Sequence, residues 1–322
     1  MTARLEADPY ENDPARWGHS LANLAEVLLG CLDASEARSV TEIGAYAGDL
    51  TRLLLEWAAG SGARVVAVDP TPHPSLVELS ETHPQLELIQ EASHEALRQI
   101  PLADAVIIDG DHNYYTVSEE LRLIDERAPG PQIPLLMLHD VGWPHGRRDA
   151  YWDPERIPDE HRQPTLARPF IFPGEPGVVD TGMPMYAAAE REGGRRNGVR
   201  TALEDFLDRR RDLRAATLAP FFGFAAVWHR EAPWAQAVAE FLEPWDRNPM
   251  LERLEANRVY HLAIAHRRSQ KLKWATSALK VQEEENAVLK RSVEDLEGEL
   301  ERLRSQSSRQ ETTPSLTDDG QA

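Results

Sequence analysis

Cysteine is almost absent from the sequence, since Cys31 is the only one among 322 residues. A disulfide within the chain is therefore excluded, and the reducing cytoplasm is the expected compartment. Cys31 lies in the apolar run 24–32, so we expect a buried, inert thiol there rather than a nucleophile.

Long apolar runs are also missing. No stretch approaches the roughly 20 apolar residues that a membrane-spanning helix needs. The first 15 residues are acidic and contain no apolar core of the kind found in signal peptides. We therefore expect no membrane segment, no membrane partner and a flexible N-terminus over residues 1–15.

Positive charge is scarce. Lys and Arg together number 35 against 54 Asp and Glu, which gives a net charge of −19. A general nucleic-acid-binding protein needs a cationic surface to displace counterions from phosphates, so this class is excluded. Hydrophobic residues make up 41% of the chain, which is enough for the core of one large α/β domain or two modest ones.

β-Prone segments alternate with helical ones over the first half of the chain. The predicted strands span residues 39–43, 63–68, 86–89, 105–108 and 134–138, and the predicted helices span residues 16–34, 49–59, 94–99 and 117–127. The last two strands are wholly apolar, which is typical of strands buried on both faces. This order predicts a doubly wound α/β fold whose mostly parallel sheet is covered by helices on both faces.

Prolines recur through residues 142–200 and prevent long helices and central strands there. Aromatic residues in the same segment favour an ordered lid or substrate-binding insertion over disorder. A helix at 198–211 and an antiparallel hairpin formed by 213–218 and 223–228 are predicted next. We therefore place the main domain at 16–230 and a helical connector at 231–270.

A seven-residue repeat begins at Leu272. One position of the repeat holds Leu272, Leu279, Asn286, Val293 and Leu300, and the position three residues later holds Ala275, Gln282, Leu289, Leu296 and Leu303. Such a repeat needs a partner helix to bury its seam, and an asparagine in the seam favours a parallel dimer in register. We expect a parallel coiled coil over 271–304 that makes a homodimer, followed by a disordered tail over 305–322. A single solvated helix folded back on the domain is the alternative.

Polar residues stand where the predicted strands end. They are Glu42 with Gly44, Asp69, the run from Asp109 to His112, and His139 with Asp140. Ligands of parallel sheets bind outside the carboxyl ends of the strands. We therefore expect these side chains to line one crevice.

The loop after the first strand contains Gly44 and Gly48, and Asp69 ends the second strand. Glycines let a backbone approach a ligand closely, and a carboxylate at the second strand's end can accept both hydroxyls of a ribose. Dinucleotide dehydrogenases share this arrangement, but Tyr46 stands where their fingerprint requires its second glycine. A nucleoside without a diphosphate therefore fits better, with an NAD-dependent oxidoreductase as the alternative.

At this point the chain resembles the class I S-adenosylmethionine-dependent methyltransferases, over roughly residues 16–230. Glu42-Ile43-Gly44-Ala45-Tyr46-Ala47-Gly48 looks like their acidic-x-Gly-x-x-x-Gly motif, in the variant of small-molecule O-methyltransferases. The final hairpin looks like their seventh strand, so the resemblance implies a Rossmann-like, seven-stranded sheet with an antiparallel last strand. It also implies that S-adenosyl-L-methionine lies with its methionine part near Glu42 and Gly44, its ribose on Asp69 and its adenine beside Ser93. The full set of cofactor-binding residues that we expect is Glu42, Gly44, Tyr46, Gly48, Asp69, Ser93 and Asp109.

Residues 107–114 and Leu138-His139-Asp140 look like segments of the metal-assisted branch, which includes the macrocin O-methyltransferases and cephalosporin-hydroxylase-like proteins. This resemblance implies that Asp109, His139 and Asp140 hold Mg²⁺ or another divalent cation. Val141 stands where the catechol-type pattern has Asn, so His139 replaces a lost ligand in this interpretation. A metal-free site is the alternative.

The resemblance implies methyl transfer to a hydroxyl of a small-molecule or sugar-type acceptor, which must be aligned and deprotonated. We expect His112 to be the base, with His139 as the alternative base and a loop-capping role as the alternative for His112. Arginines of the insertion, including Arg147 and Arg148, suit an anionic or sugar-linked acceptor unless they pair with acids of their own loop. A non-catalytic methyltransferase-like scaffold that assembles partners through its coiled coil is the alternative from another functional class.

Overall fold

A computed structural model describes residues 21–310 of the protein. The chain divides into two compact units, Met1–His266 and Arg267–Ala322. The predicted flexible segment at 1–15 and residues 311–322 of the predicted tail lie outside the described residues.

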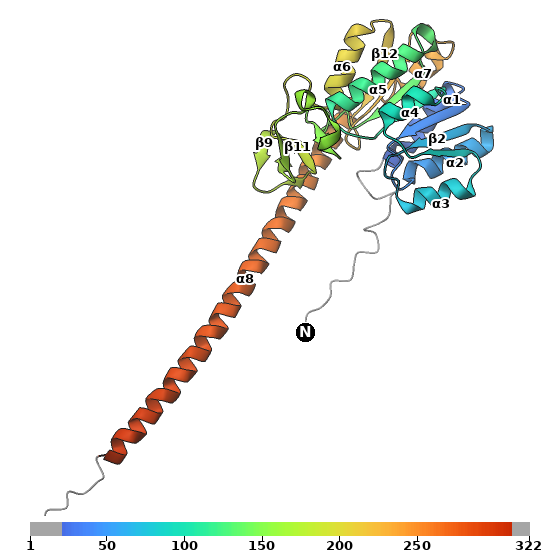
Figure 1. Ribbon diagram of the computed structural model, residues 1–322. Coiled ribbons are helices and arrows are strands. Elements are labelled where there is room, and N and C mark those ends of the chain that lie inside the picture. The colour runs from blue at the N-terminus through green and yellow to red at the C-terminus, as the bar shows by residue number, and fades with distance from the viewer. Residues whose placement is uncertain (1–20, 311–322) are drawn as a thin grey trace, which may run out of the picture. The chain divides into compact units, whose positions relative to one another are not determined.

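A seven-stranded sheet forms the centre of the first unit (Figure 1). In chain order its strands are β1 (Ser39–Ile43), β2 (Arg64–Val68), β3 (Leu86–Ile89), β4 (Ala105–Ile108), β5 (Leu135–His139), β12 (Leu213–Leu218) and β13 (Phe224–His229). They lie in the spatial order β12-β13-β5-β4-β1-β2-β3. Strands β1 to β5 pair in parallel, whereas β13 runs antiparallel to both β5 and β12. The predicted doubly wound sheet with an antiparallel last strand is confirmed.

Successive side chains of each strand point to opposite faces of this sheet, so apolar residues form a core on each face. Helices cover both cores. Val65 and Ala67 of β2 belong to one core, and Val66 and Val68 belong to the other. The first core contains apolar residues of α1 (Ala25–Ala34), α2 (Asp49–Ser61), α3 (Pro74–Thr82) and α7 (Ala235–Leu242). The second contains those of α4 (Ser93–Gln99), α5 (Tyr114–Arg127) and α6 (Val199–Arg209). Short 3-10 helices occur at Leu21–Leu24, Gly130–Gln132, Pro154–Arg156 and Asp159–His161.

Residues 142–200 contain two small antiparallel sheets in addition to irregular segments. The first has the spatial order β6 (Ala150–Tyr151), β11 (Ala187–Ala189) and β7 (Thr165–Ala167). The second has the spatial order β10 (Met183–Pro184), β8 (Phe170–Phe172) and β9 (Glu175–Val179). Ile171 and Met183 of the second sheet pack in a third core with Val259 and Ala263 of the last helix. The sequence predicts none of these strands, because runs of two to five residues among prolines show no usable alternation.

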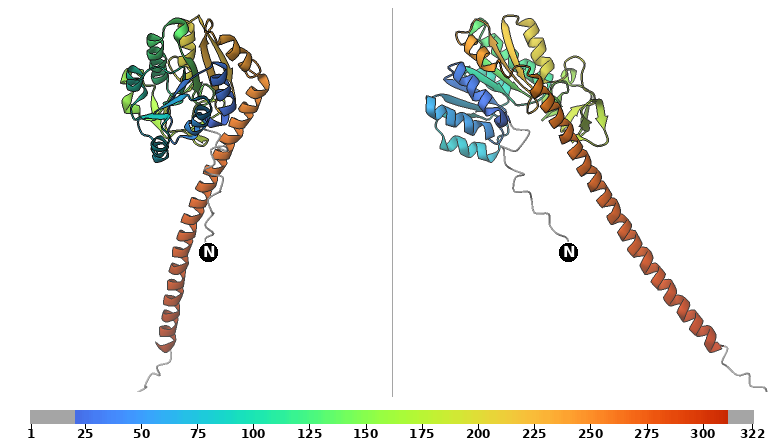
Figure 2. Two further views of the ribbon diagram at one scale, coloured as in Figure 1. Left: turned by 90° about the vertical axis from the view of Figure 1, so that its right-hand side faces the viewer. Right: turned by 180° about the vertical axis from the view of Figure 1, so that it is seen from behind.

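The last helix, α8 (Pro249–Gln310), is uninterrupted over 62 residues (Figure 2). Its residues up to His266 belong to the first unit, so that unit extends well beyond the boundary predicted at 230. The helix also continues through 305–310, where the sequence predicts the start of a disordered tail. Residues 305–310 are all polar, so they contain no repeat of apolar residues that would predict a helix. Among residues 21–310, no helix combines the length and apolar character needed to cross a membrane.

Candidate active site

The loop between β1 and α2 lies directly against the end of β4. Gly44 has a φ of +88°, and a Cβ at this position would lie 2.2 Å from the carbonyl oxygen of Asp109. Only glycine lets the two strand ends approach this closely. The N–H of Gly44 also donates to the carbonyl of Val68 at 2.9 Å, which ties the loop to β2, and Gly48, at φ +83°, caps the start of α2.

Asp69 follows β2 and holds the same loop in place. Its Oδ2 accepts a hydrogen bond from the N–H of Tyr46 at 2.8 Å, and its Oδ1 accepts one from the N–H of Thr71 at 2.8 Å. The residue is only 7% exposed. Asp69 therefore shapes the loop in addition to being a candidate ligand of the ribose.

Glu42 is buried within β1 and accepts a hydrogen bond from the Thr51 hydroxyl at 2.6 Å. Burial raises the pKa of Glu42 to about 8, against the effect of the Thr51 hydrogen bond and together with the negative charges of Asp109 and Asp69. Glu42 is therefore mainly protonated at neutral pH.

Ser93 has a different surrounding from the other predicted cofactor residues. It is the first residue of α4, after the end of β3, and its side chain lies near the buried Glu120 of α5, whose pKa it lowers. Its predicted place beside the adenine stays a prediction.

His139 ends β5 and is held from both sides of its ring. Its Nε2 lies 2.7 Å from the carbonyl oxygen of Phe221, and its Nδ1 lies 2.9 Å from Oδ1 of Asp109. A carbonyl only accepts, so Nε2 carries a proton and Nδ1 faces the carboxylates of Asp109 and Asp140. Burial opposes the charged ring, but the two carboxylates outweigh it and raise the pKa of His139 to about 10. Because the ring is buried and engaged at both nitrogens, this geometry suits a metal ligand better than a general base, which is the alternative role that the sequence allows for His139.

His112 reaches the same aspartate from the loop after β4. Its Nδ1 lies 3.0 Å from Oδ2 of Asp140, and 30% of its side chain is exposed. The ring of His145, in the segment after β5, lies 4.5 Å from the ring of His112 between centroids. His112 is thus the accessible histidine of the cluster, while His139 is the enclosed one.

Two overlapping sets of side chains could hold a metal ion in the described residues. One is Asp109, His139 and Asp140, the set predicted from the sequence, and the other is His112, Asp140 and His145. In each set the potential ligand atoms lie within 4.8 Å of one another. Asp140 is common to both, so the two sets compete for one carboxylate.

Asp111 and Asp149 join the insertion to the site. Sequence reasoning placed Asp111 in the crevice only as part of the run from Asp109 to His112, and it missed Asp149. Asp111 accepts hydrogen bonds from the N–H of Trp152 at 3.0 Å and from the amide of Asn113 at 2.7 Å. Asp149 accepts from the N–H groups of Tyr114 and Gly198 and from the Tyr151 hydroxyl, and its burial raises its pKa to about 6. These partners are up to 49 residues apart in the chain, so no local pattern could have identified them.

The two arginines at the start of the insertion have structural partners. Arg147 makes paired hydrogen bonds of 2.6 and 2.7 Å to the carboxylate of Glu204. Arg148 is fully buried and donates to the carbonyl oxygens of Ala189 and Pro176. Among the described residues, neither arginine has a hydrogen bond to an acid of its own loop, since Glu204 lies on α6 and the partners of Arg148 are backbone carbonyls. Both side chains nevertheless have structural partners, which gives no support to an anion site at these two residues.

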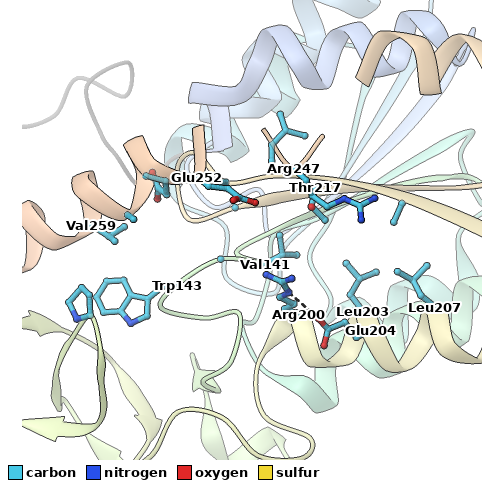
Figure 3. A pocket seen from close by; sticks show the side chains of 18 of the residues that line it. Val141, Trp143, Arg200, Leu203, Glu204, Leu207, Thr217, Arg247, Glu252 and Val259 are labelled. Carbon is cyan, nitrogen blue, oxygen red and sulfur yellow. Dashed lines mark hydrogen bonds and ion pairs between the residues drawn. The ribbon is translucent and has the colours of Figure 1, made fainter. Parts of the chain in front are cut away.

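A pocket of about 820 Å³ lies beside the site, among β12, α6 and the first part of α8. Figure 3 shows Leu203 and Leu207 of α6 on one side of it and Glu252 and Val259 of α8 on another. Val141, directly after Asp140, is part of its lining, but Glu42, Asp69, Asp109 and His112 are not. The pocket is therefore a neighbour of the carboxylate cluster and not its centre.

Residues 41–141 match a family model described as a methyltransferase domain. No curated protein matches the sequence significantly. Among solved structures, the SAH-bound methyltransferase PaMTH1 of Podospora anserina is 15% identical, with 64% of this chain and 78% of that chain covered and a TM-score of 0.41. A Klebsiella pneumoniae protein described as an O-methyltransferase is 16% identical, with 70% and 92% covered and a TM-score of 0.40. The matched residues 41–141 contain Glu42, Asp69, Asp109 and Asp140, and over this segment the predicted resemblance to methyltransferases is confirmed.

Proposed function

We propose that this protein transfers the methyl group of S-adenosylmethionine to a hydroxyl of a small-molecule acceptor, with assistance from a divalent cation. The observation that supports this most directly is the meeting of four strand ends. Gly44 packs on Asp109, Tyr46 bonds to Asp69, and Asp109 bonds to His139 beside Asp140. The ends of β1, β2, β4 and β5 therefore share one carboxylate-rich crevice, where ligands of parallel sheets bind.

The residues around the β1–α2 loop suit a nucleoside with a positive charge. Asp69 uses one lone pair of each oxygen for the loop, and a carboxylate has further lone pairs with which to accept the hydroxyls of a ribose. Glu42 is protonated only because it is buried among other acids, so a cation bound next to it would favour its charged form. S-adenosylmethionine supplies such a cation and, when bound, an activated methyl group on its sulfonium sulfur.

Asp109, His139 and Asp140 fit a divalent cation by their chemistry. Two carboxylates and an imidazole form a common mixed donor set, and the bond from Nε2 of His139 to the Phe221 carbonyl leaves Nδ1 as the donor. A cation held there would lower the pKa of an acceptor hydroxyl. When no cation is held there, His139 carries a proton between the two carboxylates, and this arrangement raises its pKa.

His112 is placed to remove the proton of the acceptor. Its Nδ1 faces Asp140, so the neutral ring can donate there and keep the lone pair of Nε2 for the acceptor hydroxyl. As the acceptor oxygen bonds to the methyl carbon, its proton passes to Nε2 of His112, and Asp140 stabilises the resulting imidazolium. The bond from the methyl carbon to sulfur breaks, and its electron pair stays on sulfur.

Calorimetric titration with S-adenosylhomocysteine tests the cofactor assignment. We expect the wild-type protein to bind it. Asp69→Asn keeps one of the two acceptors for the loop and should weaken binding by about tenfold or more, since a charge-assisted hydrogen bond contributes about 1.5–3 kcal/mol. Glu87→Gln, an exposed change on β3, is the matched control and should bind as the wild type does. Binding of NAD⁺ in place of S-adenosylhomocysteine, or equal affinity in Asp69→Asn, would contradict the proposal.

We further propose that the protein works as a cytoplasmic homodimer joined by a parallel coiled coil of α8. The seam leucines are exposed in the single chain, with Leu272 at 68%, Leu289 at 63% and Leu296 at 65%. In a parallel pair, Glu285 would face Lys290 of the second copy and Glu299 would face Arg304, and both contacts are attractive. This charge pattern and Asn286 in the seam favour a second copy of this chain as the partner helix.

A further inference from the structure

The turn between β12 and β13 is held in an unusual backbone conformation. Phe221, Phe222 and Gly223 follow one another with φ values of +54°, +70° and +89°. Bulky residues such as phenylalanine rarely adopt this left-handed region, and strained residues persist only where the surrounding structure holds them. The turn is therefore fixed by contacts from outside and not by the preference of its own residues.

The same turn supports the end of β5 at two points. The carbonyl of Phe221 accepts a hydrogen bond from Nε2 of His139 at 2.7 Å, and the carbonyl of Phe222 accepts one from the N–H of Gly142 at 2.6 Å. A Cβ at Gly142 would lie 2.5 Å from the carbonyl oxygen of Phe222, so the two backbones are in direct contact. The position of the turn therefore sets the orientation of the His139 ring and the path of the chain after Asp140.

Glu255 of α8 supplies the support from outside. Its Oε2 accepts a hydrogen bond from the N–H of Phe221 at 3.1 Å, and its Oε1 accepts one from the N–H of Phe222 at 2.8 Å. The N–H of Phe222 and the carbonyl of Phe221 belong to one planar peptide unit, in which they point in opposite directions. Glu255 and His139 therefore hold the two ends of a single rigid group.

Arg258, one turn further along α8, keeps Glu255 in place. Its Nε and Nη2 donate to the two carboxylate oxygens of Glu255 at 2.7 and 2.8 Å, which is the bidentate geometry that fixes a carboxylate most firmly. Its guanidinium also lies 4.4 Å from the centre of the Phe222 ring, within the range of a cation–π contact. Phe222 and Val259 of α8 are buried in one core. The helix, the carboxylate and the turn are thus joined by both polar and apolar contacts.

We propose that Glu255 is a positioning residue of the candidate active site. From α8 it fixes the peptide unit between Phe221 and Phe222, and the carbonyl of this unit holds Nε2 of His139. Nδ1 of the same ring then stays directed at Asp109, as it must be in order to bind a cation there. The inference rests on the proposed function, in which Nδ1 of His139 is a metal ligand. It gives α8 a role in the site where the sequence predicts only a connector at 231–270.

Nuclear magnetic resonance of the His139 ring tests the inference without cofactor, cation or turnover. In the full-length protein labelled with ¹⁵N in its histidine rings, a proton on Nε2 that bonds to a buried carbonyl exchanges slowly with water and gives its own signal. The signal is assigned by its loss in His139→Gln. We expect Glu255→Ala to abolish it at pH 7, and Glu255→Gln, which keeps one acceptor for the turn, to retain part of it.

The matched control is Glu252→Ala, which removes an exposed carboxylate one turn earlier on α8. It should leave the His139 signal as it is in the wild type. Calorimetry with S-adenosylhomocysteine should give the wild-type affinity in all the Glu252 and Glu255 variants, because the contacts of Glu255 lie with the 221–223 turn and not with the β1–α2 loop.

The consequence for cation binding is measured by titration with Mn²⁺, followed by electron paramagnetic resonance. We expect Glu255→Ala to raise the dissociation constant of Mn²⁺ by about tenfold, the lower end of the range for residues that orient metal ligands from outside. Glu255→Gln should lie between Glu255→Ala and the wild type, and Glu252→Ala should equal the wild type.

The outcomes separate this inference from the proposed function. A His139 signal that is missing in the wild type, that persists in full in Glu255→Ala or that is lost equally in Glu252→Ala would overturn the positioning role. If Glu255→Ala does not fold, the same criteria apply to Glu255→Gln, in which an undiminished signal would overturn it. A wild-type protein that shows the signal but binds no Mn²⁺ would contradict the proposed metal assistance, while loss of the signal in Glu255→Ala would still support the hold of Glu255 on His139.

Discussion

At the scale of single residues, Asp140 carries the greatest number of roles in the crevice. Its carboxylate lies 3.0 Å from His112 and 3.6 Å from His139, and it belongs to both potential metal sets. The residue adopts a φ of +58°, which costs a non-glycine residue about 1–3 kcal/mol. The surrounding structure maintains this conformation at the end of β5, where it directs one carboxylate between two histidines.

The proposed base can be separated from cofactor binding by a single substitution. We expect His112→Ala to lower kcat for methyl transfer to a hydroxyl acceptor by about a hundredfold or more, because general-base catalysis contributes about 10²–10⁴-fold. The affinity for S-adenosylhomocysteine should change little, since the contacts of His112 lie with Asp140 and His145 and not with the β1–α2 loop.

The control is His261→Ala, which removes an imidazole from an exposed position on α8, and its kcat should equal that of the wild type. Parallel losses of turnover and of S-adenosylhomocysteine affinity in His112→Ala would contradict the role of a base and indicate a structural one.

At the scale of elements, α8 contains two regions with different surroundings. Val259 and Ala263 are buried with the insertion, whereas between Lys271 and Gln306 every described residue except Gly298 is exposed. A helix whose apolar side chains stay in water gains little from folding alone. The exposure of the seam and its spacing of seven residues therefore support the proposed coiled coil.

The proposed seam can be tested by placing charges in it. We expect the double variant Leu289→Glu and Leu296→Glu to convert the dimer to a monomer, because it places charges in the buried seam of each helix. The mass measured by light scattering after size-exclusion chromatography should fall by half.

Val281→Glu with Val288→Glu is the matched control, since these valines are 55% and 54% exposed but lie outside the seam. A control variant that dissociates equally, or a wild-type protein that is already monomeric, would argue against the coiled coil. A trimer or a mixed complex would argue against the parallel homodimer.

At the scale of the whole molecule, buried acids make stability depend on pH. Glu120 of α5 is fully buried, and burial raises its pKa to about 8, with a hydrogen bond from Ser93 opposing the shift and the charge of Asp111 adding to it. An unfolded glutamate loses its proton near pH 4.5, whereas the folded protein keeps it up to about pH 8. Within this window the folded state binds the extra proton, so stability falls as pH rises.

Denaturant unfolding of Glu120→Gln between pH 5 and pH 8 checks this dependence. The variant should lose less stability with rising pH than the wild type, by up to about 1.4 kcal/mol per pH unit for one linked proton. Glu42 has a raised pKa of the same direction, so some dependence should persist in the variant. The exposed variant Glu87→Gln should follow the wild type, and an unchanged slope in Glu120→Gln would contradict the assignment.

Local patterns were sufficient for the regular part of the molecule. The strands at Ser39–Ile43, Leu86–Ile89 and Ala105–Ile108 have the bounds that the sequence predicts, and Ala105–Ile108 contains only apolar residues because it is buried on both faces. The polar residues after the first, second, fourth and fifth strands were predicted to share one edge of the sheet, since parallel pairing brings the carboxyl ends of the strands together. Helix α3 and the small sheets of the insertion were not predicted, because their short segments have no distinct period, whereas α7 lies within the helical connector predicted at 231–270.

The amino-acid sequence by itself thus determined the order of the elements, the methyltransferase-type loop and the spacing of the seam, all of which depend on neighbours within a few residues. Only the tertiary structure decided which groups meet across long separations. The carbonyl of Phe221 holds His139 from 82 residues away, and Asp111 places Trp152 from 41 residues away. Hydrogen bonds of this kind depend on how the loops close over the sheet, and the division of roles between His112 and His139 follows from that closure and not from either residue's place in the chain.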